Sequence, residues 1–322
     1  MNWQETYDGG SPGAEQAIFQ ALARDMLAIQ QSNQQKAGAA CPMRTLHAKA
    51  VTAIGNARLI VDADMPPQFA SGHIQPAAVI PASLRLSNAS GIPQADALPD
   101  MRGAAIRLHL GDEAIHDLLM TSFPVSHARD ARQFVAFAVI AAGDRATMPA
   151  RLVEAFGLEE ARRMGANLAQ GVRPCASLAQ ERFWSRGAVL WNDQPVRYDL
   201  RPAPETAPAS AMPDDLRAEM AARLARGAVR YRLALQPFRD EARTPIEDGA
   251  VEWREEDSPF TEIATIELPM QDVLGEEGLA RAAVVEAMAF NPWNAPEAFR
   301  PLGNLNRARG VIYGQSAKVW QG

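Results

Sequence analysis

The chain has 322 residues, 47% of them hydrophobic and 22% charged, which is the composition of an ordinary globular protein. Its length is sufficient for one large domain or two medium ones. The formal net charge of −6 argues against nucleic acid or an anionic membrane surface as the main partner. The two cysteines, Cys41 and Cys175, form no CxxC pattern, so neither a thiolate metal site nor a redox dithiol is expected.

The sequence also favours a location inside the cell. Its first ten residues, MNWQETYDGG, are polar and acidic and lack the apolar segment of a signal peptide. The longest apolar run, residues 134–142, is about half the length that a membrane-spanning helix needs. Two cysteines without a pairing pattern suit a reducing compartment. We therefore expect a soluble, cytoplasmic protein.

Apolar spacing and turn residues divide the first half of the chain into helices and strands. Residues 14–35 combine helix-forming residues with apolar positions at helical spacing. From residue 44 the chain becomes rich in β-branched and apolar runs, separated by proline and glycine clusters. Strands are predicted at 47–62, 79–87, 104–110 and 118–123, and a helical block at 149–170.

The second half of the chain also contains predicted strands followed by helices. Polar and apolar residues alternate within 181–201, 227–238 and 260–268, which predicts strands with one wet face. Residues 203–215 are predicted as a loop in which Asp214 or Asp215 caps a helix at 216–226. Helical residues return from 278, are interrupted by NPWNAP, and form a last helix at about 304–319.

These elements predict an α+β fold. Seven or eight antiparallel strands in two groups, with helices between and after them, are typical of a closed barrel covered by helices. The sequence has no internal repeat and no low-complexity segment, so one compact domain is the simplest organisation.

The five histidines, at positions 47, 73, 109, 116 and 127, form no tight metal-ligand pair, so zinc is not indicated. Taken alone, each is more often structural or exposed than catalytic. His47 differs through its neighbours. Five motifs follow one another along the chain: RTLHAK at 44–49, PASLRLS at 81–87, DMRG at 100–103, DLLMTSFPVSHARDARQF at 117–134 and RARGVIY at 307–313.

In this order the motifs resemble those of the catalase superfamily, over nearly the whole chain from Arg44 to Tyr313. The end of the chain looks like the short catalase-related haem proteins, without the wrapping segment and C-terminal domain of full-length catalases. The resemblance implies an antiparallel eight-stranded β-barrel with surrounding and C-terminal helices. We expect residues 1–43 to form an N-terminal helical arm and residues 44–322 the haem-binding barrel and helices.

The resemblance also implies the site. His47 is the distal base that takes a proton from one peroxide oxygen and returns it to the other, Ser87 holds its imidazole, and Tyr313 is the proximal iron ligand. A tyrosine phenol has an ordinary pKa of about 10, so a phenolate ligand needs a nearby positive charge. Arg309 precedes Tyr313 by four residues on a predicted helix and therefore lies against it.

Further residues follow from the same resemblance. Arg44, Arg85 and Arg309 face the haem propionates, because arginine pairs with carboxylates through two hydrogen bonds. Phe134 packs against the porphyrin, and Leu46 narrows the approach to the iron. The sequence has no CxxCH motif, so haem b is implied.

The sequence departs from the family at the distal side. Thr121 stands where catalases have an asparagine, and a threonine hydroxyl reaches less far toward a bound peroxide. Ser126 and His127 replace paired phenylalanines, and Ala50 replaces a glycine. We therefore expect weak catalase activity. His127 is either a second polar group near the haem channel or a structural residue.

The function predicted is that of a haem peroxidase acting on hydrogen peroxide or an organic hydroperoxide, with an unknown reducing or organic substrate. One alternative is a lipid-hydroperoxide isomerase or dehydratase. Another is a haem-binding sensor or carrier with little turnover, and a third is a β-barrel without haem. The oligomeric state is left open, a homo-oligomer included.

Overall fold

The computed structural model describes residues 3–209 and 212–321. Nine strands form one antiparallel sheet, and β5 pairs with both β4 and β7, which closes eight of the strands into a barrel. The order around the ring is β1, β2, β3, β4, β5, β7, β8 and β9, which returns to β1, while β6 extends from β7 as a hairpin. The strands are β1 Ala50–Val61, β2 Val79–Asn88, β3 Arg102–Gly111, β4 Ala114–Thr121, β5 Phe183–Trp184, β6 Val189–Trp191, β7 Gln194–Pro202, β8 Val229–Pro237 and β9 Thr261–Leu268. The predicted α+β class and the eight-stranded barrel are confirmed.

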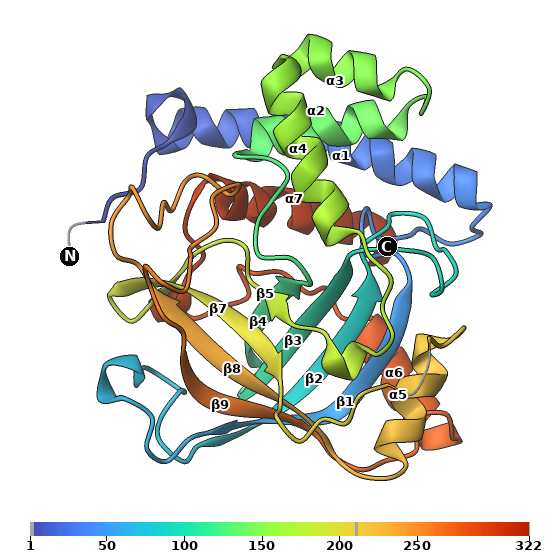
Figure 1. Ribbon diagram of the computed structural model, residues 1–322, viewed down its shortest axis with the longest axis vertical. Coiled ribbons are helices and arrows are strands. Elements are labelled where there is room, and N and C mark those ends of the chain that lie inside the picture. The colour runs from blue at the N-terminus through green and yellow to red at the C-terminus, as the bar shows by residue number, and fades with distance from the viewer. Residues whose placement is uncertain (1–2, 210–211, 322) are drawn as a thin grey trace.

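Helices cover one end and one side of the barrel. Helices α1 to α4 form a layer above the strands, with α7 between that layer and the barrel, and α5 and α6 lie beside β1 (Figure 1). In the described residues, no helix is both long and apolar enough to cross a bilayer. The α-helices are α1 Pro12–Ala37, α2 Ala131–Ala142, α3 Met148–Phe156, α4 Leu158–Gly171, α5 Leu216–Leu224, α6 Glu276–Glu286 and α7 Asn304–Gln321, and the 3-10 turns are η1 Asp8–Gly10, η2 Pro67–Phe69, η3 Leu178–Gln180 and η4 Glu297–Phe299.

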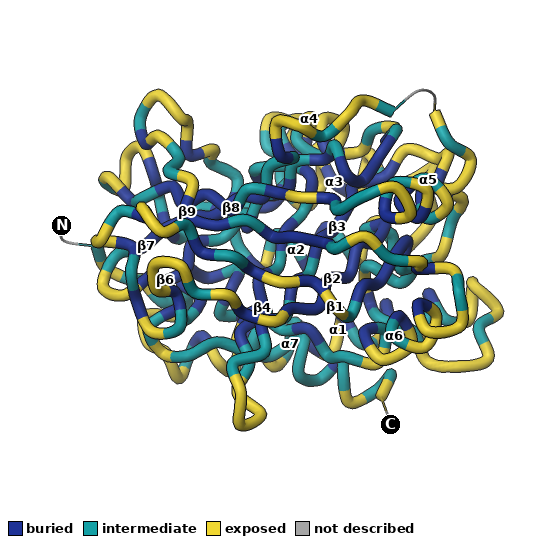
Figure 2. The backbone as a smooth tube through the Cα atoms, turned by 90° about the horizontal axis from the view of Figure 1, so that it is seen from below, coloured by how far each residue is buried: buried dark blue, intermediate teal, exposed yellow. Residues whose placement is uncertain are grey.

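The alternation of side chains gives the barrel wall two different faces. In β2, Leu84 and Leu86 belong to the apolar core that fills the barrel, and the intervening positions Arg85 and Ser87 lie on the outer face. Figure 2 shows the strands largely buried and the exposed segments concentrated in the surrounding loops. The outer face of the barrel therefore carries polar side chains on β2, whereas Ala105 of β3 and Leu119 of β4 pack there in an apolar cluster with residues of α6.

Most predicted elements are observed, although some differ in their bounds. The helical block at 149–170 is two helices, because the chain turns at Gly157 with a left-handed φ of 79°. The strand predicted at 118–123 is β4, which begins at Ala114 and ends at Thr121. Helix α2 occupies the apolar run that was not assigned to any element. Asp215 is the cap of α5, and residues 210–211 of the predicted loop lie outside the described residues.

Candidate active site

His47 and Ser87 form a hydrogen-bonded pair on the outer face of the barrel. His47 lies just before β1, and its left-handed φ of 56° turns the chain into the strand. Its backbone N–H donates to the carbonyl of Ala89 (3.0 Å), and its carbonyl accepts from Arg85 Nη2 (3.0 Å). The ring Nδ1 lies 3.0 Å from Ser87 Oγ. These bonds fix the backbone and one side of the ring, and Nε2 takes no part in them.

The imidazole rests on Gly103 of β3. A Cβ at this position would lie 2.5 Å from both Cε1 and Nδ1 of His47 and 2.8 Å from Ser87 Oγ. These separations are shorter than van der Waals contact, so only a glycine lets the ring approach the strand this closely. Sequence reasoning placed Gly103 in a motif but assigned it no role.

The surroundings of His47 keep its imidazole neutral. Burial lowers its pKa to about 3, and the charges of Arg85, Arg309, Arg186 and Arg44 lower it in the same direction. At neutral pH the ring therefore carries one proton, and one of its nitrogens is free to accept another. If Nδ1 donates to Ser87, the accepting atom is Nε2.

Arg85 and Arg44 are held at this face by α6 and the segment after it. Arg85 is 4% exposed and pairs with Glu286 (Nε to Oε1, 2.8 Å). Arg44 donates to the backbone carbonyls of Glu286 (2.6 Å) and Met288 (3.1 Å) and stacks on the Trp320 ring at 4.0 Å. Burial, followed by the charge of Arg85, lowers the pKa of Arg44 to about 10. Glu286, which the motifs did not indicate, thus contacts both arginines, Arg85 through its carboxylate and Arg44 through its backbone carbonyl.

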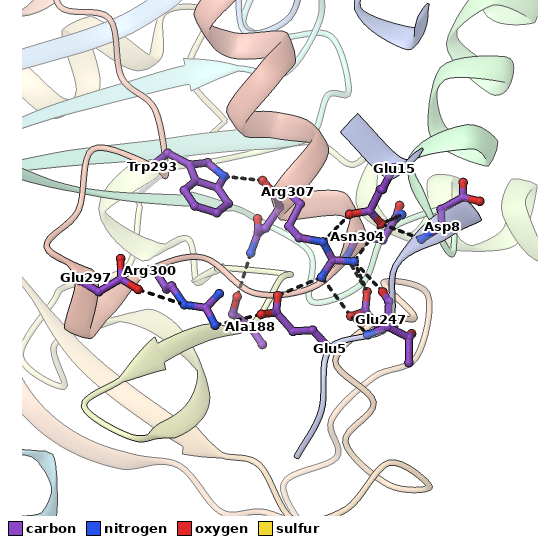
Figure 3. A network of polar contacts seen from close by, with 12 residues as sticks. Glu5, Asp8, Glu15, Ala188, Glu247, Trp293, Glu297, Arg300, Asn304 and Arg307 are labelled. Atoms are coloured by element: carbon purple, nitrogen blue, oxygen red, sulfur yellow. Dashed lines mark hydrogen bonds and ion pairs between the residues drawn. The ribbon is translucent and has the colours of Figure 1, made fainter. Parts of the chain in front are cut away.

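Arg309 and Tyr313 meet on α7, as their spacing predicts. The Arg309 guanidinium lies 5.1 Å from the centroid of the Tyr313 ring, and its Nη1 donates to Asn306 Oδ1 (2.9 Å). Arg307, on the same helix, lies among carboxylates from the N-terminal segment and the loop after β8 (Figure 3). These ion pairs attach α7, and with it Arg309 and Tyr313, to those segments.

Arg186, which no sequence pattern marked, lies between these groups. It follows β5 with a left-handed φ of 61°, and its Nη1 is 3.4 Å from Thr121 Oγ1. Burial lowers its pKa to about 10, with the charge of Arg309 acting in the same direction and Tyr313 in the opposite one. Thr121 itself pairs with Gly103 across the sheet, so Arg186 approaches the strand on which His47 rests.

The family model described as Catalase matches residues 15–148. A "Catalase-related peroxidase" of Mycolicibacterium paratuberculosis (strain ATCC BAA-968 / K-10) is 27% identical over an alignment of 303 residues, and the match covers 88% of this chain and 91% of that protein. Together with the closed barrel, these matches support membership of the catalase superfamily.

Solved catalases have the same fold. A fungal catalase has a TM-score of 0.68 at 18% identity, and catalase A from Saccharomyces cerevisiae has a TM-score of 0.67 at 15% identity; each covers 100% of this chain. A bacterial catalase has a TM-score of 0.66 at 16% identity and covers 89% of this chain. The chain spans 59% of the bacterial catalase, 66% of the fungal one and 68% of catalase A.

The remaining predicted residues are less closely associated with His47. Leu46 is 37% exposed, beside the histidine but open to solvent. Phe134 lies on α2, where its ring centroid is 5.0 Å from that of His127. His127 also packs against Phe137 at 4.4 Å, and its Nε2 is buried without a hydrogen-bond partner among the described residues. The positions of the paired phenylalanines are thus partly occupied by an imidazole whose Nε2 has no hydrogen-bond partner among the described residues.

Proposed function

We propose that this protein is a haem b-dependent peroxidase that acts on hydrogen peroxide or an organic hydroperoxide. The observation that supports the proposal most strongly is the neutral His47, anchored at Nδ1 by Ser87 and seated on Gly103, in a protein with the catalase fold. A carrier of haem has no need for such a base. The relative described as a catalase-related peroxidase points to the same class of reaction.

The charges around the site fit a haem. The pKa of His47 responds to four guanidinium groups, and Glu286 is the carboxylate that contacts Arg85. An excess of positive charge of this kind favours an anionic ligand, and haem b carries two propionates. Glu286 is 38% exposed, so a propionate can join or replace it on Arg85.

In this proposal Tyr313 holds the iron through its phenolate oxygen, and Arg309, stacked on the ring, stabilises that charge. Arg44, Arg85 and Arg309 face the propionates. Phe134 packs on the porphyrin, and Leu46 lies at the approach to the site. A bound haem supplies the iron chemistry by which the O–O bond of a peroxide is cleaved.

The protein's own contribution is the movement of one proton. His47 Nε2 accepts the proton from the peroxide oxygen that approaches it, and the same atom returns the proton to the other oxygen. Ser87 Oγ holds Nδ1 and so keeps the ring orientation constant during both transfers. The lowered pKa ensures that the imidazole is neutral before the substrate arrives.

Thr121 weakens the part of this site that handles a second peroxide molecule. Its hydroxyl donates to the carbonyl of Phe123 at 3.4 Å and accepts from Arg186 at the same distance. A hydroxyl occupied in this way is a poorer donor to bound peroxide than a free amide. We therefore propose that a reducing or organic substrate, and not a second peroxide, completes the reaction, and that catalase activity is low.

The test combines the absorption spectrum with turnover. The protein is expressed with a supply of haem, and its spectrum is recorded beside that of Tyr313→Phe; a haem band that changes in the variant is expected. Peroxide-driven dye oxidation is then measured for His47→Gln and for the control His109→Gln. The control removes a histidine that also bonds a serine on the outer face of the barrel, Ser83 at 2.9 Å.

His47→Gln is expected to lose at least about a hundredfold in rate, the usual scale of general acid–base catalysis, while the control keeps its rate. Equal activity of the two variants would remove His47 from the mechanism. A haem spectrum with no turnover in the wild type would favour the alternative of a sensor or carrier. Turnover of a lipid hydroperoxide without a reducing dye would favour the isomerase or dehydratase.

The cellular location is part of the proposal. Cys41 is exposed and Cys175 is buried, and both are free. An exposed free thiol suits a reducing compartment, so we propose that the protein works in the cytoplasm.

A further inference from the structure

A small cavity lies beside the candidate site, between the outer face of β7 and the segment 252–260. Its volume is about 50 Å³. Arg186 and Arg197 line it, together with Ser185, Tyr198 and Gln236. A space of this size holds a small ion or a few water molecules, and it is far below the several hundred Å³ of a nucleotide-sized site.

The cavity is lined by hydrogen-bond donors that have nothing to bind. Among the described residues, three buried guanidinium nitrogens lack a partner here: Nε of Arg186 and both Nε and Nη2 of Arg197. Arg197 is only 5% exposed. Its Nη1 donates to the carbonyl of Val251 at 3.0 Å, and its guanidinium lies 4.6 Å from the centroid of the Trp253 ring. A buried cation that lacks partners is costly, so such groups usually indicate a bound water or ion.

The carboxylates near the cavity do not supply that partner. Glu255 lines it but pairs with Arg182 (2.7 Å) and Arg201 (3.3 Å). Glu252 also lines it and is exposed to solvent. Burial lowers the pKa of Arg197 to about 9, although Asp248 and Glu252 act in the opposite direction. Desolvation therefore outweighs the carboxylates, and the cation is left without a contacting anion.

We propose that this cavity binds a small monovalent anion, a halide or an ion of the size of formate, held by the N–H groups of Arg197 and Arg186. An anion accepts hydrogen bonds from every donor, whereas a water molecule must also place two hydrogens of its own. Because Arg186 also donates to Thr121, the bound anion fixes the position of an arginine at the candidate site. The inference does not depend on haem, and its test does not use peroxide.

The test measures the melting temperature of the purified protein in sodium chloride and in sodium gluconate at equal ionic strength, since gluconate is too large for the cavity. Chloride is expected to raise the Tm of the wild type by at least about 3 °C relative to gluconate. Arg197→Met keeps the apolar stem but removes every N–H group, so it is expected to abolish this difference. The control Arg201→Met removes an arginine of the same strand face that does not line the cavity and that pairs with Asp199 and Glu255. It is expected to keep the difference.

A crystal of the wild type grown in bromide gives an independent measurement that does not require the variant to fold. An anomalous peak within hydrogen-bond distance of Arg197 and Arg186 is expected. Water alone in the cavity would overturn the proposal, and so would a chloride effect that survives Arg197→Met. A bromide peak without any chloride effect on the Tm would mean an adventitious ion only, which also overturns it.

Discussion

Two buried arginine clusters in this protein have opposite surroundings. Arg307, on α7, is 10% exposed on its side chain and binds Glu15 (2.6 Å), Glu5 (2.9 Å) and Glu247 (3.0 Å) (Figure 3). Burial alone would lower its pKa, but the hydrogen bonds to Glu15 and Glu247 raise it above the ordinary value. At the cavity beside β7, by contrast, burial lowers the pKa of Arg197 to about 9, because its contacts are a carbonyl and an aromatic ring.

This difference in partners distinguishes arginines that stabilise the fold from arginines that are available to bind a ligand. An arginine that meets several carboxylates joins segments, and here Arg307 connects α7 to the N-terminal segment and to the loop after β8. N–H groups that lack a partner do not stabilise the fold. A ligand that binds them therefore explains why such an arginine is buried. The same reasoning applies to the buried Nε of Arg186.

The largest effect is expected from breaking the satisfied cluster. Arg307→Met would leave Glu15 and Glu247 without their cation, and the Glu15 side chain is only 2% exposed. Glu5 would keep only its pair with Arg300. Removing one partner of a buried ion pair typically costs about 3–5 kcal/mol, because the other charge stays buried. The free energy of unfolding, measured with urea, should fall by this amount.

An exposed arginine provides the control for Arg307. Arg254 is 64% exposed and pairs with Glu256 (2.8 Å) and Asp257 (3.1 Å) on the surface. Arg254→Met should change the free energy of unfolding by no more than about 0.5 kcal/mol. If both variants lost the same stability, the network around Arg307 would have no special role in fixing α7.

The barrel was predictable because its signal is local. Alternation along each strand and the turn residues between strands are properties of short windows, so the α+β class and most strands followed from them. The closing strand β5 is only Phe183–Trp184, too short to show a period. Helix α2 was missed because its apolar residues are nearly continuous, and a run of this length has no clear helical period.

Some contacts of the candidate site could likewise be predicted from short sequence patterns, and others could not. Arg309 and Tyr313 meet because four residues on a helix set their contact. His47 and Ser87 come together because their motifs lie on neighbouring parts of one sheet. Glu286 and Arg186 come from segments far away in the sequence, and no local pattern predicts that they reach the same place. Their roles depend on tertiary packing, which no local sequence pattern reveals.

The second prediction concerns the most crowded point of the candidate site. Gly103→Ala places a methyl group 2.5 Å from the His47 ring and 2.8 Å from Ser87 Oγ, so the ring must move. A shift of about 1 Å in a catalytic group typically costs about a hundredfold in rate. On the proposed function, peroxide-driven dye oxidation should fall by about ten- to a hundredfold, and the His47 ring signals in an NMR spectrum should shift.

Gly165 is the matched control for this substitution. It lies within α4, and a Cβ there meets nothing within 4 Å. Gly165→Ala should leave dye oxidation unchanged and stabilise the helix slightly, since alanine favours a helix more than glycine does. Full activity in Gly103→Ala, with unshifted His47 signals, would contradict the tight seat described for the ring.

The smallest effect is expected at a pair of histidines whose mutual hydrogen bond joins two neutral rings. His73, in the loop before β2, lies with its Nε2 3.1 Å from Nδ1 of the buried His116 on β4, and both rings pack on Phe299. Burial, then the neighbouring His73, lowers the pKa of His116 to about 3. In the unfolded chain the pKa of histidine is about 6.5. Between these values the unfolded state binds a proton that folded His116 does not, so stability is present above pH 6.5 and is lost as the pH falls.

The predicted loss is at most about 1.4 kcal/mol per pH unit for each such histidine. His116→Gln keeps an acceptor for His73 but does not titrate, so its stability should fall less steeply than that of the wild type between pH 6 and 4.5. Urea unfolding at a series of pH values measures the two slopes. His109→Gln should change the slope less, because that ring is more exposed. Parallel plots of stability against pH for wild type and His116→Gln would contradict this prediction. They would show that His116 takes up its proton in the folded protein as readily as in the unfolded chain.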